Sequence, residues 1–267
     1  HMNKNLIYMV AIDHGKSNYK HSKFVKYSQL SWEKWCKKNN VDLHIVTEHN
    51  EKYGFPIWNK LDVTEVGKDY DKIGIVDCDT IINPNAPNIF ETLEDGISAV
   101  HDDSNLRWIY ESIGNYGMEF FRDVSMDLAT YVNAGVVFLD NKSLSVYDKL
   151  REFYLENQDK LDNWNKGGGK EQTLFNFILQ TNKYKLNLIP LVWNIINPVK
   201  TEMIQHNWQV DEPKNDWSNC NPNNPLECNS NHDNTPHFVK YGNITHFTGF
   251  PIEHRERIME WAWGFYE

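Results

Sequence analysis

Residues 73–80 read IGIVDCDT, and this stretch decides the fold. The mainly apolar run 72–76 has the length and character of a buried β-strand. Asp77 and Asp79 follow where that strand ends, and residues two apart on an extended backbone project to the same side. Two carboxylates placed there can share one hard cation. The segment therefore predicts a metal site at the end of a strand.

The flanking sequence alternates short apolar runs with stretches of helical spacing. The predicted strands are 6–12, 43–46, 72–76, 97–100 and 132–139, and the predicted helices are 24–38, 56–66, 145–156 and 171–180. This alternation indicates an α/β fold with a mostly parallel central sheet flanked by helices. In such sheets ligands bind beyond the carboxyl ends of the strands, which points to Asp13 and to residues 77–79.

Composition excludes several classes of protein. The chain has 267 residues, 13% of them aromatic, which argues against general disorder. Its net charge of −10 disfavours a nucleic-acid-binding surface. No apolar run approaches the roughly 20 residues that a membrane helix needs, so we expect no transmembrane segment. No charged segment followed by an apolar one begins the sequence, and we expect a cytoplasmic protein.

A second candidate ligand, His246, lies near the other end of the chain, in the stretch 244–249 that reads ITHFTG. A late strand that returns to the central crevice would add an imidazole to Asp77 and Asp79. Such a mixed carboxylate and imidazole set suits Mn²⁺, with Mg²⁺ as the alternative. Gly249 would let backbone N–H groups approach a phosphate closely.

No internal repeat or clear domain boundary interrupts the chain, so we expect one domain over 1–267. An irregular stretch rich in Asn and Pro, at about 201–237, is predicted to be an insertion. Trp208 and Trp217 within it are candidates for stacking on an acceptor sugar. An amphipathic helix at about 253–265 closes the chain.

Further short motifs occur in a fixed order along the chain. They are VAID at 10–13 with Tyr19, NKL at 59–61, VDCDT at 76–80, NIF at 88–90, SAVHDD at 98–103, VNAGVV at 132–137, EQ at 171–172 with Leu174 and Asn176, PLVWN at 190–194 and HFTG at 246–249. This ordered set resembles the retaining glycosyltransferases of family 8, the group that contains glycogenin and bacterial lipopolysaccharide galactosyltransferases. The resemblance runs through nearly the whole chain.

The resemblance implies a GT-A-type nucleotide-diphospho-sugar transferase fold and a Mn²⁺-dependent hexosyltransferase that uses a UDP-sugar. Its acceptor would be a hydroxyl of a glycan or a lipid-linked saccharide. The implied metal ligands are Asp77, Asp79 and His246. The implied donor-binding residues are Ala11, Asp13, Tyr19, Lys60, Asp77, Cys78, Asp102, Asn133, Ala134, Gly135 and Gly249.

The resemblance also implies retention of configuration. Gln172 would then orient and stabilise the sugar during attack on the same face, with Glu171 as the alternative, a nucleophile. Either Asp102 or Asp103 would accept hydrogen bonds from sugar hydroxyls, and we prefer Asp103. The implied catalytic residues are thus Gln172, Glu171 and Asp103.

Two departures from the family pattern stand out. The family's H-x-x-G is followed by K-P-W, whose Lys lies on the diphosphate, whereas residues 250–255 here read FPIEHR. His254, Arg255 or Arg257 would have to neutralise the phosphates instead. The family's Asp before Gln is replaced by Glu171, which is one methylene longer.

Three other functions are compatible with parts of the pattern. An inverting GT-A glycosyltransferase would use Glu171 as the general base. A degenerate protein would bind a sugar nucleotide or carbohydrate without catalysis, as the missing Lys allows. A sugar-phosphate nucleotidyltransferase would need a Gly-rich basic loop after the first strand, and DHGK at 13–16 is a poor version of one.

Overall fold

The computed structural model describes residues 4–13, 23–196, 198 and 236–267. The chain divides into two compact units. The sheet unit comprises His1–His21, Cys36–Cys78 and Asn88–Pro190, and the C-terminal unit comprises Ser22–Trp35, Asp79–Pro87 and Leu191–Glu267. Tyr19, Trp208 and Trp217, and with them most of the predicted insertion, lie outside the described residues.

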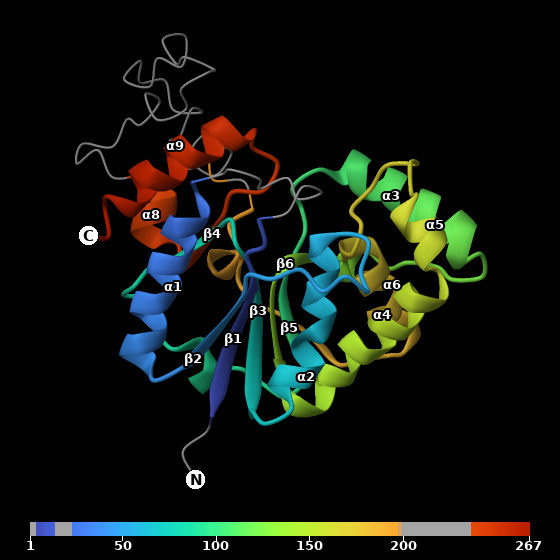
Figure 1. The fold of residues 1–267 in the computed structure, drawn as a ribbon, viewed down its shortest axis with the longest axis horizontal. Helices are drawn as coiled ribbons and strands as arrows, with labels where there is room; N and C mark the ends of the chain where they lie inside the picture. The colour runs from blue at the N-terminus through green and yellow to red at the C-terminus, as the bar shows by residue number, and fades with distance from the viewer. Residues whose placement is uncertain (1–3, 14–22, 197, 199–235) are drawn as a thin grey trace. The chain divides into compact units, whose positions relative to one another are not determined.

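The sheet unit is built on a six-stranded sheet in the order β2-β1-β3-β6-β5-β7 (Figure 1). Its strands are β1 (Asn5–Val10), β2 (Asp42–Val46), β3 (Lys72–Asp77), β5 (Ile97–His101), β6 (Val132–Asp140) and β7 (Leu186–Leu188). The pairs β1–β2, β1–β3 and β5–β7 are parallel, and β6 runs antiparallel to both of its neighbours. The predicted α/β fold with a mostly parallel sheet is confirmed.

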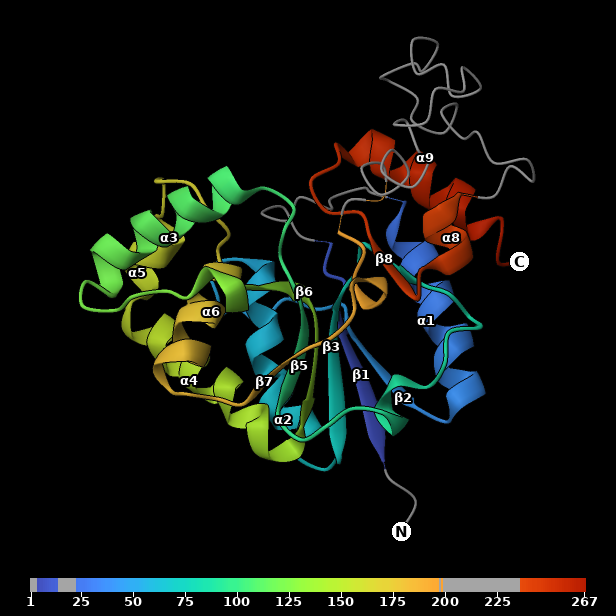
Figure 2. The same ribbon diagram turned by 180° about the vertical axis from the view of Figure 1, so that it is seen from behind.

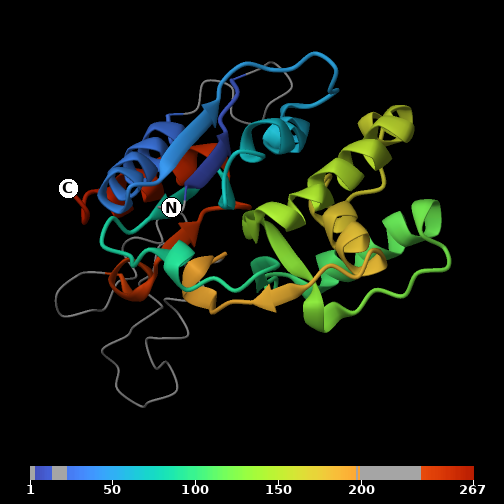
Figure 3. The ribbon, with the colours of Figure 1, turned by 90° about the horizontal axis from the view of Figure 1, so that it is seen from below.

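Helices follow most of the strands of this unit. They are the 3₁₀-helices η1 (Pro56–Asp62), η2 (Ile89–Glu91), η3 (Leu128–Thr130) and η4 (Asn141–Leu144), and the α-helices α2 (Val63–Gly67), α3 (Leu106–Phe120), α4 (Ser145–Glu156), α5 (Gln158–Asp162) and α6 (Gln172–Thr181). Figure 2 shows α2, α4 and α6 beside the strands, and in Figure 3 α4 and α6 run next to each other. None of the described helices has the length and apolar character of a membrane-spanning segment.

The main core of this unit lies between one face of the sheet and these helices. Alternate residues of the strands, such as Leu6 and Tyr8 on β1 and Ile75 on β3, point to the same face because side chains alternate along a strand. Leu150 of α4 and Phe175 of α6 pack against them and are fully buried. Apolar burial therefore holds the strand ends in place relative to the helices.

Two helical segments differ from the sequence prediction. The stretch 56–66, expected to be one helix, begins as η1 and becomes α-helical only at Val63. Pro56 stands at the start of η1, where its missing N–H costs no hydrogen bond. Helix α3 was not predicted from the sequence. Its exposed side mixes Leu106, Tyr110 and Met118 with Arg107 and Glu111, so the polar face that usually reveals a surface helix is interrupted by apolar residues.

The C-terminal unit contains a two-stranded antiparallel sheet of β4 (Thr80–Ile82) and β8 (Ile244–His246). Its helices are η5 (Leu191–Trp193), α8 (His237–Tyr241), α9 (Ile252–Trp263) and most of α1 (Val25–Asn39). Two buried indoles of α1 anchor this unit, since Trp32 donates to the hydroxyl of Thr80 and Trp35 to the carbonyl of Ala86. Helix α9 confirms the predicted closing helix.

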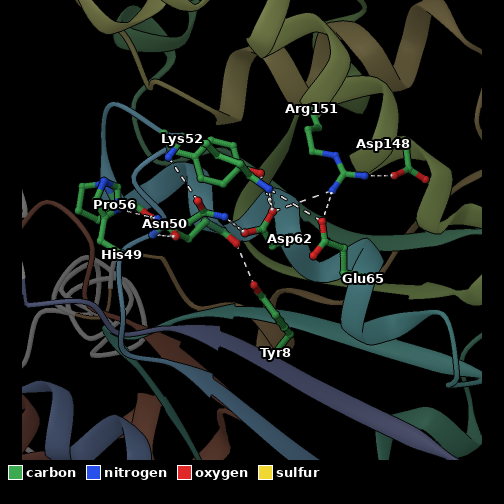
Figure 4. A network of polar contacts seen from close by, with 11 residues as sticks. Tyr8, His49, Asn50, Lys52, Pro56, Asp62, Glu65, Asp148 and Arg151 are labelled. Atoms are coloured by element: carbon green, nitrogen blue, oxygen red, sulfur yellow. Dashed lines mark hydrogen bonds and ion pairs between the residues drawn. The ribbon is translucent and has the colours of Figure 1, made fainter.

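A polar network ties the loop after β2 to η1 and α4 (Figure 4). The carboxylate of Asp62 accepts hydrogen bonds from Tyr53 at 2.6 Å and Asn50 at 3.0 Å, and lies 2.8 Å from the Lys52 ammonium. Arg151 of α4 bridges Glu65 at 3.0 Å and lies 3.9 Å from Asp62. Partial burial raises the pKa of Asp62, but these hydrogen bonds outweigh it and hold the pKa below its usual range.

Replacing Asp62 with Asn should therefore destabilise the protein in a pH-dependent way. A carboxylate with a lowered folded-state pKa contributes stability above its unfolded pKa of about 3.9, and that contribution disappears at lower pH. We expect D62N to cost about 1 kcal/mol at pH 7, since the group is partly solvated, and clearly less near pH 3. Urea unfolding at both pH values measures this, with exposed Asp123→Asn as the control. An equal loss at both pH values would contradict the assignment.

Candidate functional site

A buried ammonium group lies where β3 ends. The side chain of Lys60, on η1, is 2% exposed, and its Nζ lies 2.6 Å from Asp77 Oδ1 and 2.6 Å from Glu171 Oε1. Burial alone would lower the pKa of Lys60, but the two carboxylates outweigh it and raise the pKa above its usual value. Lys60 is therefore a permanent cation between two acids, and it also lies 3.4 Å from the carbonyl oxygen of Ala134.

The neighbouring residue fixes the position of Lys60. Asn59 is 1% exposed, and its amide nitrogen donates to the carbonyl of Pro56. Its own carbonyl accepts the hydroxyl of Tyr8, and its side-chain oxygen accepts the N–H of Asn50. The 3₁₀ turn that carries Lys60 is thereby bound both to β1 and to the loop after β2.

A second polar cluster lies at the ends of β5 and β6 and the start of α6. Asp102 is 2% exposed and accepts hydrogen bonds from Gln172 Nε2 at 2.9 Å and Asn133 Nδ2 at 3.1 Å. The side-chain oxygen of Gln172 accepts the N–H of Ala134 at 3.1 Å, and that of Asn133 accepts the N–H of Gly135 at 3.0 Å. This arrangement brings together two amides and a carboxylate that were predicted separately.

Buried hydroxyl and amide groups hold the first turn of α6 against β6. Asn176 accepts the N–H of Val132 and donates to its carbonyl. Thr173 exchanges hydrogen bonds with Ser112 of α3 and with Tyr131, whose hydroxyl is 3.4 Å from Gln172 Nε2. Burial raises the pKa of Tyr131 to about 12, so its hydroxyl stays protonated at neutral pH.

The C-terminal unit carries a separate ionic cluster on Asp79. His246 Nε2 lies 3.1 Å from Asp79 Oδ1, and an Arg255 guanidinium nitrogen lies 3.3 Å from Asp79 Oδ2. The three side chains are 3%, 4% and 10% exposed for His246, Asp79 and Arg255, respectively. Arg255, on α9, also donates to the carbonyl of Phe250 at 2.8 Å.

Strand pairing sets the geometry of this cluster. Thr80 of β4 stands opposite His246 of β8, and the N–H of Phe247 donates to the carbonyl of Asp79 at 2.9 Å. Gly249, three residues after His246, has φ of +77°, a conformation that favours glycine. A Cβ added there would meet nothing within 4 Å, so its backbone is sterically open.

Most of the expected site residues fall into these clusters. In the sheet unit they are Lys60, Asp77, Asp102, Asn133, Ala134, Gly135, Glu171 and Gln172, and in the C-terminal unit they are Asp79 and His246. Asp103 is exposed, whereas its neighbour Asp102 is buried in the amide cluster. Ala11 and Asp13 follow β1, Cys78 is buried, and Tyr19 lies outside the described residues.

Sequence reasoning missed the supporting residues Ser112, Tyr131 and Thr173. Only Asn176 carried a signal, as part of the stretch EQTLFN at 171–176. The others are ordinary hydroxyl residues, and nothing in their spacing indicates that they meet.

Comparison with known proteins defines the class of fold. No protein-family model and no curated protein sequence matches the chain. Among solved structures, it is similar to a glycosyltransferase involved in the glycosylation of the major capsid of PBCV-1. That match has a TM-score of 0.56 and 12% identity, and covers 97% of this chain and 99% of the other.

A second match is the galactosyltransferase LgtC in complex with donor and acceptor sugar analogues, with a TM-score of 0.53, 12% identity, and coverage of 98% of this chain and 96% of the other. An active-site glutamine-to-glutamate variant of LgtC also matches, with a TM-score of 0.50, 12% identity, and coverage of 96% and 95%. The chain therefore has the GT-A glycosyltransferase fold, as expected from the family 8 resemblance.

Removing the buried cation should destabilise the fold. Lys60→Met would leave Asp77 and Glu171 facing each other without a counter-charge, and we expect a loss of about 3 kcal/mol in the free energy of unfolding. Lys185→Met is the matched control, because its ion pair with Glu94 is exposed and should contribute under about 1 kcal/mol. Chemical denaturation compares the two, and equal losses would show that the Lys60 pairs do not support the fold.

Proposed function

We propose that this protein is a metal-dependent glycosyltransferase that moves a sugar from a nucleoside diphosphate sugar, UDP-sugar in the first instance, to a hydroxyl of a saccharide acceptor. The observation that carries the proposal is the D-x-D segment at a strand end of a GT-A fold, with its second carboxylate paired to His246. The acceptor would be a glycan or a lipid-linked saccharide.

The donor atoms suit a divalent ion. Asp79 Oδ1 and His246 Nε2 are 3.1 Å apart, and two ligand atoms at right angles on one ion, each at about 2.1 Å, lie about 3 Å apart. Asp77, two residues before Asp79, is our proposed third ligand. Carboxylate and imidazole ligands favour Mn²⁺, with Mg²⁺ as the alternative. When bound, such an ion supplies Lewis-acid stabilisation to the departing diphosphate.

The amide cluster of the sheet unit is our proposed sugar pocket. Asn133 and Gln172 present polar groups beside Ala134 and Gly135, whose small side chains leave room for a sugar ring. Lys60 holds the carboxylates of Asp77 and Glu171 in place at the edge of this pocket. Its positive charge would also offset the negative charge that builds up during donor cleavage.

The pairing of Glu171 supports retention over inversion. A general base needs a carboxylate free to take a proton, but Glu171 Oε1 lies 2.6 Å from the Lys60 ammonium. An ion-paired carboxylate is a weaker base and a weaker nucleophile. We therefore favour attack from the same face of the sugar, with the amide of Gln172 orienting the ring. Analysis of the product anomer decides between this route and inversion.

Arg255 is our candidate for the role of the missing Lys. Its guanidinium lies 3.3 Å from the carboxylate of Asp79, whereas Arg257 on the same helix is exposed. A planar guanidinium can bind two phosphate oxygens at once while remaining charged. Placed beside a metal-binding carboxylate, it would neutralise part of the diphosphate charge.

Binding of the nucleotide should require both the metal and its ligands. We expect UDP with Mn²⁺ to raise the melting temperature of the wild-type protein, because a ligand at 100 times its Kd adds about 2.7 kcal/mol. GDP and CDP should do so less. Asp79→Asn and His246→Gln should each abolish the shift, and exposed Asp123→Asn should keep it.

Three results would change the proposal. A rise in melting temperature caused by UDP without any metal would contradict the proposed metal site. UDP binding with neither transfer nor hydrolysis of UDP-sugars would point to a degenerate binding protein. Stabilisation by no nucleotide would reject the glycosyltransferase.

Substitution of Arg255 should weaken the binding of the donor's diphosphate. We expect Arg255→Gln to raise the KM for UDP-sugar about tenfold and Arg255→Lys to recover part of that loss, because Lys keeps the charge but not the fork of donors. Arg257→Gln is the matched control on the same helix, and initial-rate kinetics is the measurement. If the Arg257 variant is the more impaired, the assignment of Arg255 is wrong.

A further inference from the structure

Four hydrogen-bond donors surround the buried carboxylate of Asp102. Its Oδ1 accepts the backbone N–H of Ser104 at 3.0 Å and the Ser104 hydroxyl at 2.6 Å. Its Oδ2 accepts Gln172 Nε2 at 2.9 Å and Asn133 Nδ2 at 3.1 Å. A carboxylate offers about four acceptor positions, so protein groups use the whole capacity of Asp102.

These bonds decide which way two amides point. The carboxylate attracts the nitrogen ends of Asn133 and Gln172, because an amide oxygen facing it would be repelled. At the other end of each amide, the side-chain oxygen of Asn133 accepts the N–H of Gly135, and that of Gln172 accepts the N–H of Ala134. Both amides therefore have one favoured orientation, and a single acid is common to the two.

The backbone holds Asp102 firmly in this position. The register of β5 against β6 shifts between Ala99 and His101, the irregularity that re-aims the side chains at the end of a strand. The N–H of Asp102 then donates to the carbonyl of Tyr131 at 3.0 Å. Two residues later the bonds from Ser104 close a local turn on the carboxylate.

We propose that Asp102 is a positioning residue of the sugar pocket rather than a ligand of the sugar. It fixes the amide orientations of Asn133 and Gln172, and these amides, not the acid, meet the donor sugar. The inference rests on the proposed glycosyl transfer for its kinetic test, but the hydrogen-bond arrangement itself can be tested without any activity.

The kinetic test compares the buried Asp102 with an exposed acid outside the pocket. Asp102→Asn places an NH₂ group where the surrounding hydrogen-bond donors need an acceptor. We therefore expect kcat to fall about a hundredfold, which is the effect of misplacing a group by about 1 Å. The KM for UDP-sugar should change less than threefold. Asp123→Asn, at an exposed acid outside the pocket, should stay within twofold of wild type. A KM that rises more than tenfold at unchanged kcat would mean that Asp102 binds the sugar directly.

The structural test is a double-mutant cycle read by thermal unfolding. Gln172→Glu places a second carboxylate against Asp102 and should lower the melting temperature. Combining it with Asp102→Asn restores an amide and an acid across the same contact, and we expect the double variant to recover at least half of that loss. Additive losses would overturn the positioning role.

The two parts of the design separate failure of the inference from failure of the proposed function. If the wild-type protein transfers no sugar, the thermal cycle still judges Asp102. If the cycle shows no recovery while UDP with Mn²⁺ still stabilises the Asp102→Asn variant, the glycosyltransferase stands and the role of Asp102 is rejected.

Discussion

The sheet unit depends on one buried cation between two acids. Lys60 lies 2.6 Å from Asp77 at the end of β3 and 2.6 Å from Glu171 at the start of α6. Burying a charge of either sign alone would be costly, so each group requires the others. The contact joins a strand end, a 3₁₀ turn and a helix start that are far apart in the sequence. Any ligand that binds Asp77 must do so in the presence of this ammonium.

Cations accompany both carboxylates of the D-x-D segment. Asp77 forms an ion pair with Lys60 within the sheet unit, and Asp79 forms one with Arg255 within the C-terminal unit. Such pairing offsets the cost of removing these carboxylates from water. It also means that an arriving dication competes with cations already in place. In the proposed metal site, the affinity for the ion would then reflect a difference between two favourable arrangements rather than binding to unpaired acids.

Strands and short motifs could be predicted from the sequence, whereas contacts between residues far apart in the chain could not. The apolar run before Asp77 predicts a buried strand, and the order of the short motifs indicates the GT-A fold that the structure has. Nothing local distinguishes Asp102 from Asp103, because alternation along β5 is broken by the register shift after Ala99. The contact between Glu171 and Lys60 spans 111 residues, and the extra methylene of Glu is uninformative until both ends are placed.

The reversed direction of β6 has a consequence for how the pocket tolerates change. The parallel strands bring their carboxyl ends to the ligand edge, but β6 brings its beginning. Asn133 and Ala134 therefore lie among the first residues of a strand that is buried as far as Leu139. Side chains alternate in β6 as in any strand. A shift of one residue in the register of β6 would therefore turn Asn133 to the opposite face of the sheet, away from Asp102. The segment that leads into this strand is therefore constrained in length.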